Sequence, residues 1–450
     1  MVDSITRELM LFAAAGLMVG GVDDLALDGL FLLRRLWRGR EPQPWVRDLP
    51  EPATATRFAI LVPAWNEAAV IGAMLAATLG RYRHRDYLIF VAAYANDRAT
   101  VDAIARVAER DGRVRLVVNP RPGPTTKADN LNAAWRALLR EEAASGRGFV
   151  AAMLHDAEDV VHPDELRVCA ALLGEADVVQ LPVLPLVHPK APMVSGHYAD
   201  EFAESHGKQM VMRAALGAGM PLAGTGCAIA TAMLRRIAET RGGLPFEPTS
   251  LTEDYELGLA IAELGGRGVF ARYRDDGGEP VAVRAYFPGD FAAAARQKAR
   301  WMVGIALAGW DRTGWARPTQ LTDHWMRMRD RRAPLAVLVL AAAYAALLAW
   351  ALDDLLHAWS GEPVPVMAPA WLLAFNMAML AWRLAMRVAF TTRDYGWREG
   401  LRAVPRFLVG NTVSLAAAPR ALAIYAAMLL GAAPVWDKTE HEYPAVEAAG

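Results

Sequence analysis

The stretch Phe58-Ala-Ile-Leu-Val62, followed directly by Pro63-Ala64-Trp65-Asn66-Glu67, decides the fold class. Five apolar residues stopped by a proline are typical of a strand buried in a parallel sheet, and residues 67–79 then have helical apolar spacing. The same alternation continues, with strands expected at 87–93, 114–118 and 149–154 and helices at 100–110 and 127–139. Strands that alternate with helices predict an α/β fold with a mostly parallel sheet covered on both faces.

The composition of the chain excludes several classes of protein. Hydrophobic residues make up 54% of the 450 residues and charged residues 22%, which is too apolar for an ordinary soluble enzyme. The net charge of −1 offers no overall basic footprint for nucleic acid, so no nucleic-acid partner is expected. Two cysteines, Cys169 and Cys227, are too few for a disulfide framework. Because the apolar residues concentrate at the two ends, we expect a soluble domain flanked by membrane helices.

The first apolar run predicts a retained membrane helix. Leu9 to Gly21 is almost uninterrupted, and a basic cluster, Arg34 to Arg38, follows it. A secretory signal peptide has its positive charge before the apolar run, whereas a retained helix with a cytoplasmic C-terminal end has it afterwards. Asp23, Asp24 and Asp28 are costly at membrane depth, so they face other helices or the spanning part ends before them.

The C-terminal third carries three further apolar runs. Residues 334–356 are long enough to span, and the connector 353–369 contains neither Lys nor Arg, which predicts an extracytoplasmic position. Residues 370–390 return to a predicted loop with Arg393, Arg398 and Arg402, which indicates the cytoplasm. Gly410-Asn411 and Pro419-Arg420 interrupt the last run, 404–431, which favours a re-entrant or interfacial pair of helices over one clean span.

Polar and acidic residues follow three of the predicted strands. They are Asn66-Glu67, Asn96-Asp97 and His155-Asp156-Ala157-Glu158-Asp159. Since the carboxyl ends of parallel strands meet at one edge of the sheet, these carboxylates repel one another unless a cation offsets their charge. Hard oxygen ligands favour Mg²⁺ or Mn²⁺, and such an ion is well placed to neutralise a diphosphate. The alternative is that these are ordinary polar loops at strand ends.

Other phosphate or metal sites have weaker support. The chain contains no GxxxxGK[ST] segment, and Gly224-Thr225-Gly226 lacks the third glycine of a dinucleotide fingerprint. His155 and His162 have no further Cys or His nearby, which argues against zinc.

Two later segments add candidate catalytic residues. Thr252-Glu253-Asp254 opens a predicted helix at 255–264, with Thr252 as its N-cap, and capping alone is the alternative explanation. Gln297, Arg300 and Trp301 recur at i, i+3 and i+4 on an amphipathic stretch, 291–310, and therefore share one helix face. An Arg can bind a diphosphate and an indole can stack on a sugar, whereas alone the motif is more typical of a membrane-surface helix.

Taken in order, these segments resemble the membrane-bound family-2 glycosyltransferases of the polysaccharide-synthase type, such as cellulose, chitin and hyaluronan synthases. The resemblance covers about residues 55–315. It rests on residues 62–67, Asn96-Asp97, Lys127-Ala-Asp-Asn-Leu-Asn132, Asp156-Ala-Glu158, Gly224-Thr225-Gly226, Thr252-Glu253-Asp254 and Gln297-x-x-Arg300-Trp301. Finer features resemble the bacteriophage-adsorption protein B (NfrB) branch: residues 155–159, residues 198–204 and Trp436-Asp437-Lys438-Thr439. The usual metal motif of the family is Asp-x-Asp, whereas Glu158 holds the third position here, with Asp159 beside it.

The resemblance implies a GT-A (Rossmann-like) catalytic domain and a division of the chain into five parts. These are an N-terminal transmembrane helix (1–40), the GT-A domain (55–290), an amphipathic interfacial segment with QxxRW (291–330), transmembrane or re-entrant helices (334–432) and a cytoplasmic tail (433–450). The implied location is the bacterial inner membrane, multi-pass, with the catalytic domain in the cytoplasm. Chains of the NfrB branch often continue into a domain that resembles a cyclic di-GMP binder, and none is expected within these 450 residues.

The resemblance also implies a role for each candidate residue in an inverting transfer from a nucleotide-sugar, with a UDP-sugar as the expected donor. The residues implied to bind the donor are Pro63, Glu67, Asn96, Asp97, Lys127 and Asp156. The Mg²⁺ or Mn²⁺ ligands are Asp156 with Glu158 or Asp159, and the catalytic residues are Asp254, as the base, and Glu253. The residues implied to contact the acceptor and the diphosphate are Gly224, Thr225, Gly226, Gln297, Arg300 and Trp301.

The expected acceptor is a growing polysaccharide or a lipid-linked sugar. With three or four membrane segments the chain is small for a polymer channel, so an export partner or a homo-oligomer is expected. Two alternatives stay open: a single addition to a lipid carrier, and a catalytically weak scaffold or receptor component of an envelope system, which the altered metal motif favours.

Overall fold

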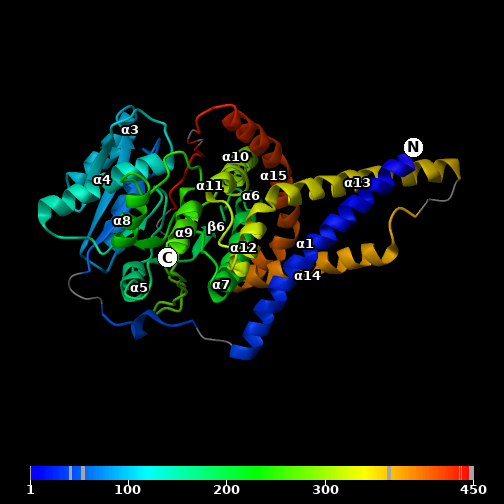
Figure 1. Ribbon diagram of the computed structural model, residues 1–450, viewed down its shortest axis with the longest axis horizontal. Coiled ribbons are helices and arrows are strands. Elements are labelled where there is room, and N and C mark those ends of the chain that lie inside the picture. The colour runs from blue at the N-terminus through cyan, green and yellow to red at the C-terminus, as the bar shows by residue number, and fades with distance from the viewer. Residues whose placement is uncertain are drawn as a thin grey trace.

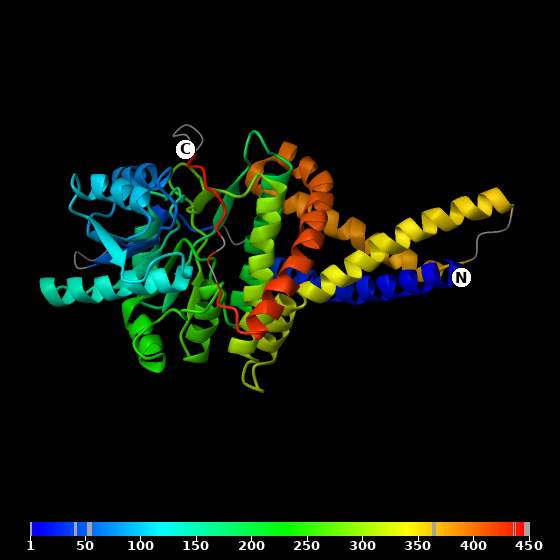
Figure 2. The same cartoon turned by 90° about the horizontal axis from the view of Figure 1, so that it is seen from above.

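The computed structural model describes residues 2–39, 43–51, 56–361, 366–434, 436 and 438–444. A sheet domain occupies one end of the molecule, and long helices from both ends of the chain extend away from it (Figures 1 and 2). The order of the parts along the chain is therefore the predicted one, with the sheet domain between apolar helices.

The central sheet has seven strands in the order β3-β2-β1-β4-β7-β5-β8. Its strands are β1 (Phe58–Pro63), β2 (Tyr87–Tyr94), β3 (Val114–Asn119), β4 (Ala151–Leu154), β5 (Val178–Gln180), β7 (Cys227–Ala230) and β8 (Gly268–Phe270). Strands β1 to β4 are parallel, and only β7 runs antiparallel to its neighbours β4 and β5. A separate parallel pair joins β6 (Val183–Leu186) to β9 (Val283–Tyr286). The four predicted strands and the mostly parallel sheet are confirmed.

Helices cover both faces of this sheet, because alternate side chains of each buried strand point to opposite sides. Ile60 and Val62 of β1 belong to a core shared with α2 (Ile71–Arg81), α3 (Arg98–Ala108) and α5 (Glu165–Leu172). Ala59 and Leu61 belong to a second core, on the other face. That core is formed with α4 (Lys127–Ser145), α8 (Thr231–Thr240) and α9 (Glu253–Glu263).

Four helices are long and apolar enough to cross a membrane. They are α1 (Val2–Arg38), α13 (Ala333–Ser360), α14 (Ala370–Tyr395) and α15 (Trp397–Leu429). Helices α1, α13 and α14 lie side by side and point away from the sheet domain, with the N-terminus at the far end (Figures 1 and 2). At one close approach, a Cβ on Gly16 of α1 would lie 2.6 Å from a methyl group of Val339 on α13.

The acidic residues of α1 face other helices of the protein. This is one of the two alternatives that the sequence left open for them. Asp23 and Asp24 pair with arginines of α12 (Leu321–Arg331) and of its neighbours: Arg329, Arg332 and Arg383. Asp28 pairs with Lys208 at 2.5 Å and accepts a hydrogen bond from Trp382 Nε1 at 2.8 Å. Each of these carboxylates therefore has a partner from another helix, which offsets the cost of burying its charge.

The prediction of a pair of helices at 404–431 is wrong. Helix α15 is continuous through Pro405 and Pro419, and it crosses the base of the three-helix bundle (Figure 2). Each proline removes one backbone hydrogen bond, but packing on both sides of the interruptions holds the helix together. Val413 packs with α6 (Val194–Glu204), and Ala417 and Ala421 pack with α10 (Phe291–Met302).

The predicted arginine loop at 393–402 is also shorter than expected. Arg393 lies in the last turn of α14, and Arg398 and Arg402 lie in α15. Only Gly396, with φ of +86°, joins the two helices. A positive φ is accessible to glycine at no steric cost, so a single residue reverses the chain here.

Candidate active site

A cavity of about 110 Å³ opens beyond the carboxyl end of β4, where segments far apart in sequence meet. The predicted site residues that line it are Lys127, Asp156, Glu158, Asp159, Thr225, Glu253, Asp254, Gln297, Arg300 and Trp301. The structure therefore brings the predicted metal ligands, the predicted base, the QxxRW residues and two of the six predicted donor residues, Lys127 and Asp156, to one place.

Lys127, in the first turn of α4, lies at the centre of the carboxylates. Its Nζ is 2.5 Å from Asp156 Oδ1 and 3.7 Å from Glu253 Oε1. Burial disfavours the charged ammonium, but Asp156, Glu253 and Asp254 together raise the pKa of Lys127 well above its usual value. This cation offsets part of the mutual repulsion of the carboxylates.

Asp254, in the first turn of α9, has the electrostatics of a general base. Burial first, and then the neighbouring carboxylate of Glu253, raise the pKa of Asp254 to about 7. Its Oδ1 accepts a hydrogen bond from the backbone N–H of Tyr255 at 2.8 Å. A carboxylate with a pKa near the working pH can hold or release a proton, which is what acid–base chemistry requires.

The backbone of Gly224 lies directly against this base. A Cβ at Gly224 would be 2.6 Å from Asp254 Oδ2 and 3.2 Å from Lys127 Nζ, and its φ is +75°. Both the space and the backbone conformation therefore require glycine. Gly226, with φ of +60°, is in contact with Val283 of β9 instead and does not line the cavity.

A buried group under the cavity fixes the loop after β4. His155 lies between two carboxylates, with Nδ1 2.9 Å from Asp159 Oδ2 and Nε2 2.8 Å from Glu165 Oε1. Burial disfavours the charged ring, yet Glu165 and Asp159 raise the pKa of His155 to about 10. Asp159 Oδ2 also accepts hydrogen bonds from the Asp156 N–H at 2.8 Å and from the Thr225 hydroxyl.

The acceptor-side residues lie on one face of α10, as predicted. Trp301 packs edge-on against Tyr198, with ring centroids 5.9 Å apart, and Phe287 lies beside both rings. Gln297 Oε1 and Thr252 Oγ1 are buried at this cavity and have no hydrogen-bond partner among the described residues. Two unsatisfied acceptors in a polar cavity suit a ligand that carries hydroxyl groups.

The prediction that Thr252 is the N-cap residue of α9 is confirmed. Its hydroxyl, however, makes no capping hydrogen bond. The hydroxyl packs instead against Gly304, where an added Cβ would meet Thr252 Oγ1 at 2.4 Å. Gly304 belongs to a π-helical turn, Val303–Leu307, that follows α10. Tertiary packing has taken the place of the local cap.

The loops after β1 and β2 form a second patch, outside the cavity lining. Asp97 accepts from the Asn66 N–H at 2.6 Å and from the Thr100 N–H at 3.3 Å, so it joins the two loops and caps α3. Asn96 exchanges hydrogen bonds with the backbone of Gly123. Of the predicted donor residues, Pro63, Glu67, Asn96 and Asp97 thus do not line the cavity, and Glu67 is linked to its wall through His441.

The C-terminal segment fills the space between this patch and the cavity. Lys438 Nζ lies 2.6 Å from Glu67 Oε1, and His441 Nδ1 lies 2.9 Å from Glu67 Oε1 and 3.1 Å from Glu158 Oε2. Burial opposes the charged ring of His441, but Glu158 and Glu67 raise its pKa to about 10. Trp436 and His441 form part of the cavity wall, which sequence reasoning missed. The resemblance of residues 436–439 to the bacteriophage-adsorption protein B branch pointed to this segment, but it assigned no role to these residues.

The candidate metal ligands fit a hard divalent cation. Asp156 and Glu158 both line the cavity, and the contact of Glu158 Oε2 with His441 Nδ1 at 3.1 Å is an ion pair without the geometry of a hydrogen bond. The positive charges of His441 and Lys438 outweigh the effect of burial and lower the pKa of Glu158, so it is ionised near neutral pH. Glu67, Glu158 and His441 also place their ligand atoms within 4.8 Å of one another.

Comparison with known proteins identifies the family. Residues 55–304 match the family described as "Glycosyltransferase like family 2". The chain belongs to glycosyltransferase family 2. It is 34% identical, over 99% of its length, to the bacteriophage adsorption protein B of Escherichia coli K12 and equally to the bacteriophage N4 adsorption protein B of Escherichia coli O157:H7. The chain spans 62% of the length of these relatives.

The fold has a solved counterpart in a mannosyltransferase from Pyrobaculum calidifontis, in complex with GDP-mannose and Mn²⁺. The two are 18% identical with a TM-score of 0.50, over 91% of this chain and 99% of the other. The likeness confirms the GT-A fold, and the apolar helices predicted at both ends of the chain are present. The resemblance to the bacteriophage-adsorption protein B branch is confirmed as well.

Proposed function

We propose that this family-2 protein is an inverting glycosyltransferase of the bacterial inner membrane, with a nucleotide-sugar donor, expected to be a UDP-sugar. The observation that carries the proposal is the shared cavity of Asp156, Asp254 and Arg300 beyond the carboxyl end of β4. A metal-binding carboxylate, a base and a cation for the leaving diphosphate are the groups that sugar transfer requires.

Asp156 and Glu158 would hold Mg²⁺ or Mn²⁺, which supplies charge neutralisation for the diphosphate when bound. Asp159 is less suited as a ligand because its Oδ2 already accepts from Thr225 and from the Asp156 N–H and is paired with His155. Glu158 holds the third position of the usual Asp-x-Asp motif, and its side chain lines the cavity together with Asp156. Lys127 would contact the diphosphate from the opposite side.

The transfer itself is a single displacement at the anomeric carbon. The acceptor hydroxyl oxygen forms a bond to this carbon while the bond to the phosphate oxygen breaks, and the nucleoside diphosphate leaves with the electron pair. Asp254 takes the hydroxyl proton, and Glu253 helps to set its pKa. Arg300 offsets the charge of the leaving group, while Trp301 and Gln297 position the acceptor sugar.

The contacts of α15 support a catalytic domain on one side of a three-helix membrane anchor, and the basic cluster Arg34 to Arg38 favours the cytoplasmic side. Both halves of α15 contact segments outside the anchor: Arg406 Nε donates to Pro192 O at 2.8 Å, and Tyr425 Oη to Asp311 Oδ2 at 2.6 Å. We propose that a helix held in this way lies along the membrane surface. Three crossing helices are few for a polymer channel, so export of a polysaccharide would need a partner protein or a homo-oligomer.

The test is a screen of donors with membranes that contain the full chain. Labelled UDP- and GDP-sugars are supplied with Mg²⁺ or Mn²⁺, and the lengths of the products are measured. Metal-dependent transfer from one donor, absent in Asp254→Asn, supports the proposal; long products indicate a polysaccharide and single additions a lipid-linked acceptor. Metal-dependent nucleotide binding without transfer or hydrolysis from any donor would instead indicate a scaffold component, which the ion pairs of Lys438 and His441 over the donor side favour.

A further inference from the structure

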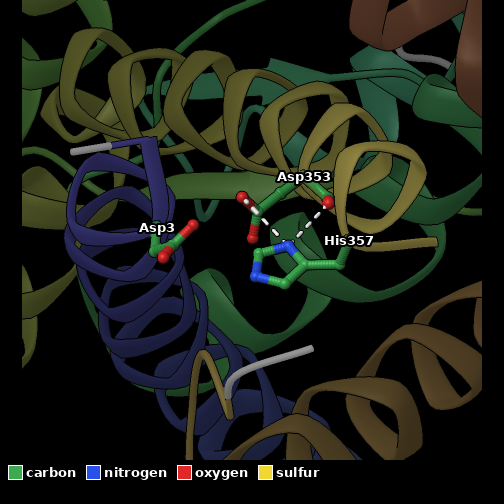
Figure 3. A group of neighbouring side chains, drawn as sticks. All are labelled: Asp3, Asp353 and His357. Carbon is green, nitrogen blue, oxygen red and sulfur yellow. Dashed lines mark hydrogen bonds and ion pairs between the residues drawn. The ribbon is translucent and has the colours of Figure 1, made fainter. Parts of the chain in front are cut away.

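A second cluster of ionisable side chains lies where α1 and α13 meet, at the end of the helical bundle farthest from the sheet domain. Asp3 is in the first turn of α1, and Asp353 and His357 are one turn apart on α13 (Figure 3). Each contributes one ligand atom, and these atoms all lie within 4.8 Å of one another. Two carboxylates and an imidazole thus face one another between two helices.

The carboxylates of this cluster have fewer charged partners than the other acidic residues of the bundle, since the ion pair of Asp353 is with His357, at 3.8 Å. Asp353 is 1% exposed, and its Oδ2 has no hydrogen-bond partner among the described residues. In the part of the chain that the structure describes, no Lys or Arg forms an ion pair with Asp3 or Asp353, whereas Asp23, Asp24 and Asp28 all have such partners. A buried carboxylate oxygen without a hydrogen bond, such as Asp353 Oδ2, is costly unless a cation or a proton joins it.

The histidine is held in the tautomer that metal ligation requires. His357 Nδ1 lies 2.9 Å from the backbone oxygen of Asp353, which can only accept, so Nδ1 carries the hydrogen. The lone pair is then on Nε2, on the side of the ring that faces α1 (Figure 3). Metal-ligating histidines commonly donate their other ring N–H to a backbone carbonyl in this way.

We propose that Asp3, Asp353 and His357 bind a divalent transition metal of the Zn²⁺ class and thereby join the first turn of α1 to the last turns of α13. One imidazole nitrogen with two carboxylates is a donor set that suits Zn²⁺ better than Mg²⁺. Asp3 is exposed, so solvent can reach the ion and complete its coordination. The site is separate from the catalytic cavity and does not depend on the activity proposed above.

The experiment counts bound zinc on the purified full chain in detergent, with its affinity tag removed. The metal-stripped protein is dialysed against Zn²⁺ with a weak competing chelator, and the metal per chain is measured by mass spectrometry. Asp353→Asn and His357→Gln are compared with Asp354→Asn, a matched control because Asp354 is the exposed neighbour on the same helix. The catalytic carboxylates are identical in all of these proteins, so differences among them report on this cluster alone.

We expect the wild type and Asp354→Asn to hold one more Zn²⁺ per chain than Asp353→Asn and His357→Gln, whose affinity falls at least about tenfold. If the buried variants fail to fold, Asp3→Asn gives the same comparison, since that side chain is exposed and its loss disturbs no packing. Equal zinc content in the wild type and Asp3→Asn, or in the wild type and Asp353→Asn, overturns the proposal and leaves a carboxylate pair that shares a proton.

Discussion

If the proposed function holds, Asp254→Asn is expected to remove most of the sugar transfer by this family-2 protein while leaving its affinity for the donor nearly intact. The amide has the shape of the carboxylate and keeps an oxygen for the Tyr255 N–H, but it cannot accept the acceptor proton at neutral pH. Removal of a general base costs about 10²–10⁴-fold in kcat, which corresponds to about 3–5 kcal/mol of barrier. Donor binding survives because Lys127 keeps Asp156 at 2.5 Å and Glu253 at 3.7 Å.

The raised pKa of Asp254 adds a second readout to the same experiment. Asp254 must be deprotonated to act as the base, so with a pKa of about 7 the rate of the wild type rises with pH through neutrality. At pH 6 about one-tenth of the carboxyl groups are ionised, against one half at pH 7, so kcat/KM falls about fivefold between these values. The assay is sugar transfer from the active donor between pH 5.5 and 8.5, with nucleotide affinity measured separately.

A control in the same helix separates loss of the base from damage to α9. Glu263→Gln changes a half-exposed carboxylate at the last position of α9, outside the cavity, and should keep the wild-type rate and pH profile. The reasoning is refuted if Asp254→Asn retains turnover within about tenfold of the wild type. It is equally refuted if the acidic limb keeps its midpoint in that variant, because another group would then be the base.

Three further substitutions test the surroundings of the base. Gly224→Ala should lower kcat about 10²-fold or more in the transfer assay without unfolding the chain, because the added methyl group meets the Asp254 carboxylate at 2.6 Å; near-normal transfer would contradict this. His155→Gln should lower the free energy of unfolding by about 3–5 kcal/mol, since it leaves buried carboxylates without their cation; a loss below about 1 kcal/mol in denaturant unfolding would argue against it. With Mn²⁺ present, His441→Ala should strengthen UDP binding about tenfold, because Glu158 is released from its ion pair to hold the metal, and an unchanged Kd by calorimetry would show that the C-terminal segment does not compete with the donor.

The parts of the fold that follow from local pattern could be predicted from the sequence. Strands β1, β2, β3 and β4 form at the four apolar runs, as predicted. Parallel strands are buried on both faces, so their side chains are apolar almost without interruption. The convergence of Asp156 and Lys127 was also predictable, since a strand end and the first turn of a following helix open on the same edge of the sheet. The prediction that Asp254 lies close to Asp156 and Lys127 depended on the family resemblance. No local sequence rule relates residues about a hundred positions apart.

The errors share one physical cause, which is tertiary packing that overrides a local signal. Pro419 and Gly410 predict interruptions in an isolated helix, yet α15 continues through them because α6 and α10 pack against it. The hydroxyl of Thr252 likewise packs against the turn that contains Gly304 and therefore makes no capping hydrogen bond. Apolar residues that repeat every 3.6 positions predict an amphipathic helix. This periodicity does not indicate which other surface the helix will pack against.

The C-terminal segment shows why the function is harder to predict than the fold. Residues 438–441 lie more than 370 positions from Glu67, and nothing in their local composition predicts that Lys438 and His441 reach its carboxylate. Their positive charges nevertheless occupy the region where a donor diphosphate and its metal are expected, and the cavity of about 110 Å³ is smaller than the roughly 300 Å³ that ligand sites usually offer. For the donor proposed above we therefore expect this segment to move aside, so that the acidic residues that pair with the cations of the chain's own tail would instead hold the metal that accompanies the donor.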